Sequence, residues 1–60
     1  MKHIETKRGL QALLKRYKEA GAPQYWIDVI EGCIKEDLAM DEVDYENTPD
    51  ELKPLWKGLK

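Results

Sequence analysis

The chain has 60 residues, of which 37% are charged, with ten Lys/Arg against twelve Asp/Glu and a formal net charge of −2. A domain of this length encloses one small core and leaves little room for a catalytic cleft. One cysteine excludes an internal disulfide, and with one histidine we expect no metal site and no cofactor.

The charges fall into three blocks along the chain. Residues 1–27 hold six Lys/Arg and two Asp/Glu, residues 28–51 hold ten Asp/Glu and one Lys, and residues 52–60 hold three Lys and no acid. The partition predicts a dipolar molecule whose charges steer its encounters with a partner.

The first predicted element is a helix over about residues 6–20, with Thr6 as N-cap and Gly21 in the left-handed position after its end. Its apolar residues have the i, i+3, i+4, i+7 spacing of one helical face: Leu10, Leu13, Leu14 and Tyr17. The residues before it are expected to fray.

A second helix is predicted over about residues 23–38, beginning at Pro23. Its apolar residues, Leu38 included, cover about half of the circumference, enough to pack against more than one neighbour. Asp37 interrupts this stripe, so either the helix ends there or the carboxylate pairs with a basic residue of the first helix. The short link between the helices predicts an antiparallel hairpin.

Residues 39–47 read as an acidic connector, in which Val43 and Tyr45 alternate with acids as in a short extended run. The sequence from Thr48 to Glu51 matches a capping box and predicts a tail helix over about residues 49–58. Pro54 should make that helix kinked or partly 3₁₀. The predicted fold class is all-α: one domain over residues 1–60, with a hairpin at about 6–38, a connector at 39–47 and a short amphipathic helix in 48–60.

Enzymatic activity is not expected. Cys33 lies on an apolar helical face with no histidine near it in sequence, which indicates a buried structural thiol. The acidic run lacks the spacing of a calcium loop. Acids interrupt the longest apolar stretch, so no membrane span is expected, and a start at Met1 without a signal peptide favours a cytoplasmic protein.

The function that we expect is a protein–protein interaction module, a regulator or inhibitor that occupies the surface of a larger protein. A small chain of this kind is also compatible with a phage or mobile-element origin. In the tail, Trp56 either folds back onto the hairpin or docks in a partner's groove as part of a helix. The candidate partner-binding residues lie in the connector and the tail: Asp41, Glu42, Asp44, Tyr45, Glu46, Leu52, Leu55, Trp56 and Leu59.

Three other hypotheses stay open. The acidic segment 28–51 could mimic nucleic acid and block a basic groove of an enzyme. The wide apolar face of the second helix could instead drive homodimerisation, which would make this a self-associating structural protein. Direct nucleic-acid binding is disfavoured, because the second helix exposes acids, although the first helix is basic.

One local resemblance bears on function. The stretch from Trp26 to Glu31 with Ile34 and Lys35, preceded by Leu14 and Tyr17 on a first helix, resembles the helical hairpin of the Sda-type sporulation-checkpoint proteins. That family inhibits sensor histidine kinases, so the resemblance implies a kinase-inhibitor hairpin. It covers about 25 residues, the basic end of the family's second helix is replaced here by Glu36 and Asp37, and residues 41–60 have no counterpart.

Overall fold

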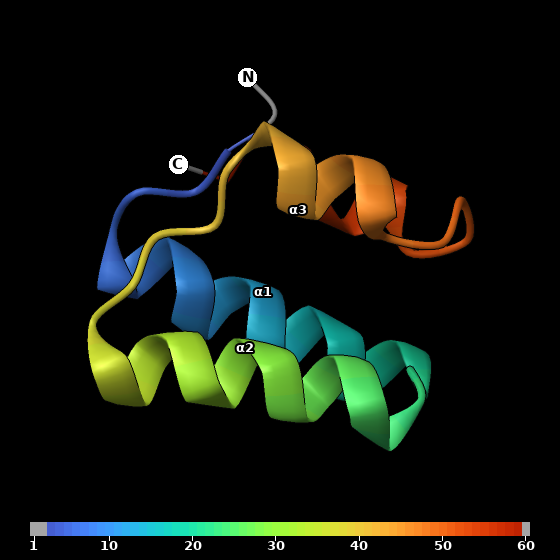
Figure 1. The fold of residues 1–60 in the computed structure, drawn as a ribbon. Coiled ribbons are helices and arrows are strands. Elements are labelled where there is room, and N and C mark those ends of the chain that lie inside the picture. Colours follow the sequence, from blue (N-terminus) through green and yellow to red (C-terminus); the bar gives the residue numbers. More distant parts are fainter. Residues whose placement is uncertain (1–2, 60) are drawn as a thin grey trace.

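The computed structural model describes residues 3–59 (Figure 1). Within them the chain forms α1 (Lys7–Ala20), α2 (Gln24–Glu36), α3 (Glu42–Asn47) and the 3₁₀-helix η1 (Lys53–Trp56). α1 and α2 lie side by side as a hairpin, and α3 lies above them, with the C-terminal segment behind it (Figure 1). The predicted all-α fold with a helical hairpin and a short C-terminal element is confirmed.

Local capping sets both ends of α1. The Thr6 hydroxyl accepts a hydrogen bond from the Gly9 N–H at 3.0 Å, and Gly21 has a φ of 72°. No atom outside its immediate neighbourhood lies within 4 Å of where a Cβ on Gly21 would stand. Glycine is therefore favoured at this position by its backbone conformation and not by crowding.

α2 is slightly shorter than predicted. Pro23 is its N-cap, with an extended ψ of 145°, and the helix ends at Glu36 because Asp37 has a left-handed φ of 60°. The exposed Asp37 thus terminates the helix, the first of the two alternatives considered for it. Leu38 lies beyond the helix end and is 53% exposed, so its assignment to the buried stripe is wrong.

The residues on either side of the hairpin pair with each other. Ile4 and Met40 form an antiparallel bridge, with N–O distances of 2.8 and 3.0 Å between their backbones. Both side chains are buried, and Ile4 is 0% exposed. The expectation of a frayed start is wrong at Ile4, because this contact with a residue 36 positions away holds it in the core.

The extended run predicted around Val43 and Tyr45 is also wrong, since these residues lie in α3. Asp41 and Asp44 form a reciprocal capping box: each side chain accepts the other's backbone N–H, at 3.0 and 3.1 Å. Two carboxylates at this spacing satisfy the backbone donors that start a helix. The hydrogen bonds of the capping box therefore favour a helix over the extended conformation that the alternation of apolar and acidic residues had predicted.

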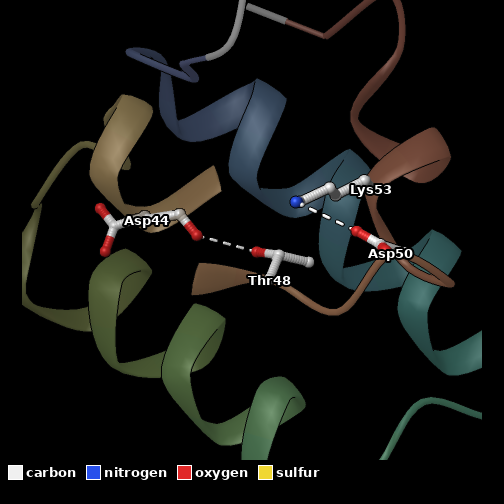
Figure 2. A network of polar contacts seen from close by, with 4 residues as sticks. All are labelled: Asp44, Thr48, Asp50 and Lys53. Atoms are coloured by element: carbon white, nitrogen blue, oxygen red, sulfur yellow. Dashed lines mark hydrogen bonds and ion pairs between the residues drawn. The ribbon is translucent and has the colours of Figure 1, made fainter. Parts of the chain in front are cut away.

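The capping box predicted at Thr48 and Glu51 does not form. Thr48 follows α3, is 3% exposed, and its hydroxyl donates to the Asp44 carbonyl at 2.9 Å (Figure 2). The next residues make a turn, with a 3.2 Å ion pair between Lys53 and Asp50 (Figure 2). Only Lys53–Trp56 is helical, and as a 3₁₀-helix, because Pro54 lacks the N–H that a longer α-helix needs.

The core draws buried side chains from both ends of the described chain as well as from the hairpin. Its buried apolar side chains come from the N-terminal bridge, both helices of the hairpin, the connector and the tail: Ile4, Leu10, Leu13, Tyr17, Ile27, Ile30, Met40, Leu52 and Trp56. The wide apolar face of α2 was expected to pack against more than one neighbour, and the same chain supplies the additional neighbour.

Candidate interaction surface

The tail is folded back onto the hairpin, the first of the two alternatives proposed for it. Trp56 is 2% exposed, and its indole N–H donates to the Tyr17 hydroxyl at 2.9 Å. Tyr45 packs edge-on against the Trp56 ring, with 5.3 Å between the ring centroids. Trp56 is therefore a core residue in this structure, and it could reach a partner only if the tail detached.

The Tyr17 hydroxyl at this contact stays protonated at neutral pH. Burial raises the pKa of Tyr17 above its ordinary value of 10.0, and the contacts of its hydroxyl with the Trp56 and Thr48 side chains offset part of that rise. A buried indole N–H without an acceptor would cost about 1–3 kcal/mol. The hydroxyl thus makes burial of the tryptophan favourable.

Arg16 holds the tail from the side of α1. One guanidinium nitrogen donates to the carbonyl oxygens of Leu55 and Lys57, each at 2.8 Å. Nothing in the local sequence pattern distinguishes Arg16 from its basic neighbour Lys15. Only the packing of the tail against this side of α1 reveals its role.

The other predicted tail residues are differently placed. Leu52 is buried, whereas Leu55 and Leu59 are half-buried. Leu59 lines an open hollow of about 420 Å³ beside the first half of α1. The residues around this hollow come from the two ends of the described chain: Thr6, Arg8, Gly9, Ala12, Gly58 and Leu59.

The predicted connector residues divide between structure and surface. Asp44 and Tyr45 are half-buried, and the Lys53 ammonium lies 5.5 Å from the centre of the Tyr45 ring. Asp41 is exposed, but hydrogen bonds from backbone N–H groups, chiefly that of Asp44, hold its pKa below the ordinary 3.8. Glu42 and Glu46 are exposed on α3.

Exposed apolar side chains accompany these acids. Leu38 is 53% exposed and Val43 is 65% exposed, on the segment that leads from α2 into α3. Residues 36–52 contain no Lys or Arg. We define the acidic–apolar surface as the exposed acids and the exposed large apolar residues of segment 36–46: Glu36, Asp37, Leu38, Asp41, Glu42, Val43 and Glu46.

The sequence prediction missed Leu38 and Val43 as candidate contact residues. It assigned Leu38 to the buried stripe of the second helix and Val43 to an extended run. A helical reading of 41–47 would have placed Val43 beside Glu42 and one turn from Glu46, on an acidic helix too short to bury it.

The exposed side of α1 carries the opposite charge. Lys7, Arg8, Lys15 and Lys18 are all exposed there. The Lys18 ammonium lies 3.7 Å from the Glu31 carboxylate of α2, an ion pair across the hairpin. Because both side chains are about half exposed, this pair contributes only about 0–1 kcal/mol.

Cys33 is half-buried on α2. Burial raises the pKa of its thiol above the ordinary 9.0, and the carboxylates of Asp44 and Glu36 raise it further. An activated cysteine needs the opposite environment, with a base or positive charge beside it. Cys33 therefore has the character of a packing residue. Among residues 3–59, no group of His, Cys, Asp and Glu has the arrangement of a metal site.

No helix in the described part of the chain is long and apolar enough to cross a membrane. Comparisons with protein-family models, with curated proteins and with solved structures give no match. The resemblance to the sporulation-checkpoint hairpin thus stands on its residues alone.

Proposed function

We propose that this chain is a protein–protein interaction module that docks its acidic–apolar surface on a basic surface of a larger protein and regulates it by occupying that surface. The observation that carries the proposal is the exposure of Leu38 and Val43 within a stretch that has carboxylates and no cations. A chain with so small a core would gain stability by burying two such side chains, and it leaves them in water.

The two kinds of residue have different roles in such a complex. Carboxylates at the rim, such as Glu36 and Glu42, raise the association rate and select a cationic partner. Apolar side chains at the centre, such as Val43, lose their water on docking and slow dissociation. The proposal retains the acidic part of the predicted site and leaves Leu52 and Trp56 to the core.

Affinity capture of tagged protein from lysate of its own cells, with matched variants, tests the proposal. We expect Glu36→Gln with Glu42→Gln to reduce capture of one specific protein by about tenfold or more, and Val43→Ser to do the same. The control is Glu19→Gln with Glu51→Gln, which removes two exposed carboxylates outside the acidic–apolar surface and should leave capture unchanged.

Competition identifies the kind of partner surface. Release of the captured protein by added double-stranded DNA would assign the acidic–apolar surface to a nucleic-acid-binding groove, as the mimicry hypothesis requires. Retention in the presence of DNA would assign it to another basic surface. Equal capture by the wild type, both surface variants and the control would refute docking through this surface.

A further inference from the structure

The hollow beside α1 suggests a second binding site. We infer that this hollow receives helix α3 of a second copy of the chain, with Val43 as the apolar anchor. The contact would join different surfaces of the two copies. It uses a residue of the acidic–apolar surface but does not depend on the proposed function.

The hollow combines an apolar lining with positive charge. Gly9, Ala12 and Leu59 line it, and the exposed Arg8 stands at its edge. The first turn of α1 carries Lys7 and Arg8 and no acidic residue, so the side-chain charge there adds to the positive end of the helix. An occupant that matches both properties has an apolar side chain flanked by carboxylates.

α3 has that combination. Val43 is 65% exposed, Glu42 precedes it, and Glu46 follows one turn later on the same helix. The first turn of α3 carries Glu42 and Asp44, the reverse of the charge in the first turn of α1. The two surfaces are thus opposite in side-chain charge, and each offers apolar atoms.

The occupant must come from another molecule. Val43 is not among the residues that line the hollow, and its exposure shows that its own chain does not cover it. Since hollow and α3 are distinct surfaces, each copy can offer both, and the contact is heterologous. It extends into short chains or closes into a ring, and with charged groups at its rim it should weaken as salt screens them.

Sedimentation equilibrium over a range of protein concentrations tests the inference. The wild type should show an average mass that rises with concentration at low salt and falls toward the monomer at high salt. Arg8→Glu places a carboxylate at the edge of the hollow, where it faces the carboxylates of α3, and Glu42→Arg places a guanidinium on α3, where it faces Arg8. Each variant alone should associate more than about tenfold more weakly than the wild type.

An equimolar mixture of the two variants should recover association, because the unchanged α3 of the Arg8→Glu copy can then meet the unchanged hollow of the Glu42→Arg copy. The matched control is Lys15→Glu, which makes the same charge change as Arg8→Glu on α1 but at a residue that does not line the hollow. It should associate as the wild type does, and circular dichroism should show unchanged helicity in all three variants.

Three results would overturn the inference: a monomer at every concentration, no recovery in the mixture, or an equal loss with Lys15→Glu. The experiments distinguish a failure of this inference from a failure of the proposed function. Arg8→Glu leaves α3 intact, so capture of a heterologous partner by this variant reports on the proposed function alone. Recovery of self-association in the mixture reports on the hollow alone.

Discussion

At the scale of single residues, two side chains of α1 determine where the tail lies. Tyr17 accepts the indole N–H of Trp56, a residue 39 positions later, and Arg16 donates to two carbonyl oxygens of the tail. Adjacent residues on one helix thus hold the aromatic side chain and the backbone of the same segment. The buried side-chain donors and acceptors of residues 3–59 all have partners.

Truncating Trp56 should be severely destabilising. Trp56→Ala removes a buried aromatic and leaves the Tyr17 hydroxyl without its donor, so we expect a loss of about 3–5 kcal/mol in the free energy of unfolding. Urea denaturation followed by circular dichroism measures it. The control Tyr25→Ala truncates an aromatic that is 66% exposed and should cost far less. Equal losses would show that Trp56 is not a core residue in solution.

Arg16 should matter more than its basic neighbours. Arg16→Ala removes two charge-assisted hydrogen bonds to the tail, one of them exposed, and should cost about 1–2 kcal/mol. For a domain of this size that corresponds to a fall in Tm of roughly 5–15 °C. Lys15→Ala is the comparison, with an expected change within about 0.5 kcal/mol. An equal fall in Tm for both variants would show that the hydrogen bonds from Arg16 to the tail do not stabilise the fold.

At the scale of elements, α3 is a helix made largely of acids. It has only six residues, too few for a helix to be stable alone, and three carboxylates, those of Asp41, Glu42 and Asp44, lie at its N-cap and in its first turn. The Asp41–Asp44 capping box begins it and the Thr48 hydroxyl closes it, so its two ends are specified locally. Contact of Tyr45 with Trp56 then fixes it to the tail.

The capping box predicts a pH dependence. Because hydrogen bonding lowers the pKa of Asp41 in the folded state, its contribution to stability is fully present above the unfolded value of 3.8. That contribution is lost as pH falls through the lower folded pKa. Asp41→Asn keeps a capping side chain and removes the titration. The free energy of unfolding, measured by denaturation at several pH values between about 5 and 2, should therefore fall less steeply in Asp41→Asn than in the wild type. Equal slopes for the two proteins would exclude this role of Asp41.

At the scale of the whole molecule, the hairpin depends on what covers it. The tail supplies Leu52 and Trp56 to the core, and the bridge between Ile4 and Met40 supplies two more buried side chains. A chain of 60 residues buries only about 60% of the surface that its unfolded form exposes, so it has little stability to lose. The segments around the hairpin are therefore part of the folding unit.

A truncated chain should show this dependence directly. A variant ending at Asn47 lacks both tail core residues, and we expect it to lose helicity and cooperative thermal unfolding by circular dichroism. A second variant ending at Gly58 keeps Trp56 and both carbonyl acceptors of Arg16, and it should still unfold cooperatively. Cooperative unfolding of the shorter variant would mean that the hairpin is an independent domain.

The sequence by itself determined the features that depend on near neighbours. Apolar periodicity and backbone rules that act over a few residues predict the span of α1, the left-handed Gly21, the hairpin and the interruption at Pro54. The exposed acids Glu42 and Glu46 of the candidate site were also predicted, because charged side chains rarely lose contact with water.

Only the tertiary structure decided the rest. Three contacts join residues that are 36 to 41 positions apart: the bridge from Ile4 to Met40, the hydrogen bond from Trp56 to Tyr17 and the hydrogen bonds from Arg16 to the tail. No local pattern specifies such pairs. Those pairings decide that Trp56 is buried and that Val43 stays in water. An amphipathic segment can pack against either its own chain or a partner, and the outcome depends on which contact has the lower free energy.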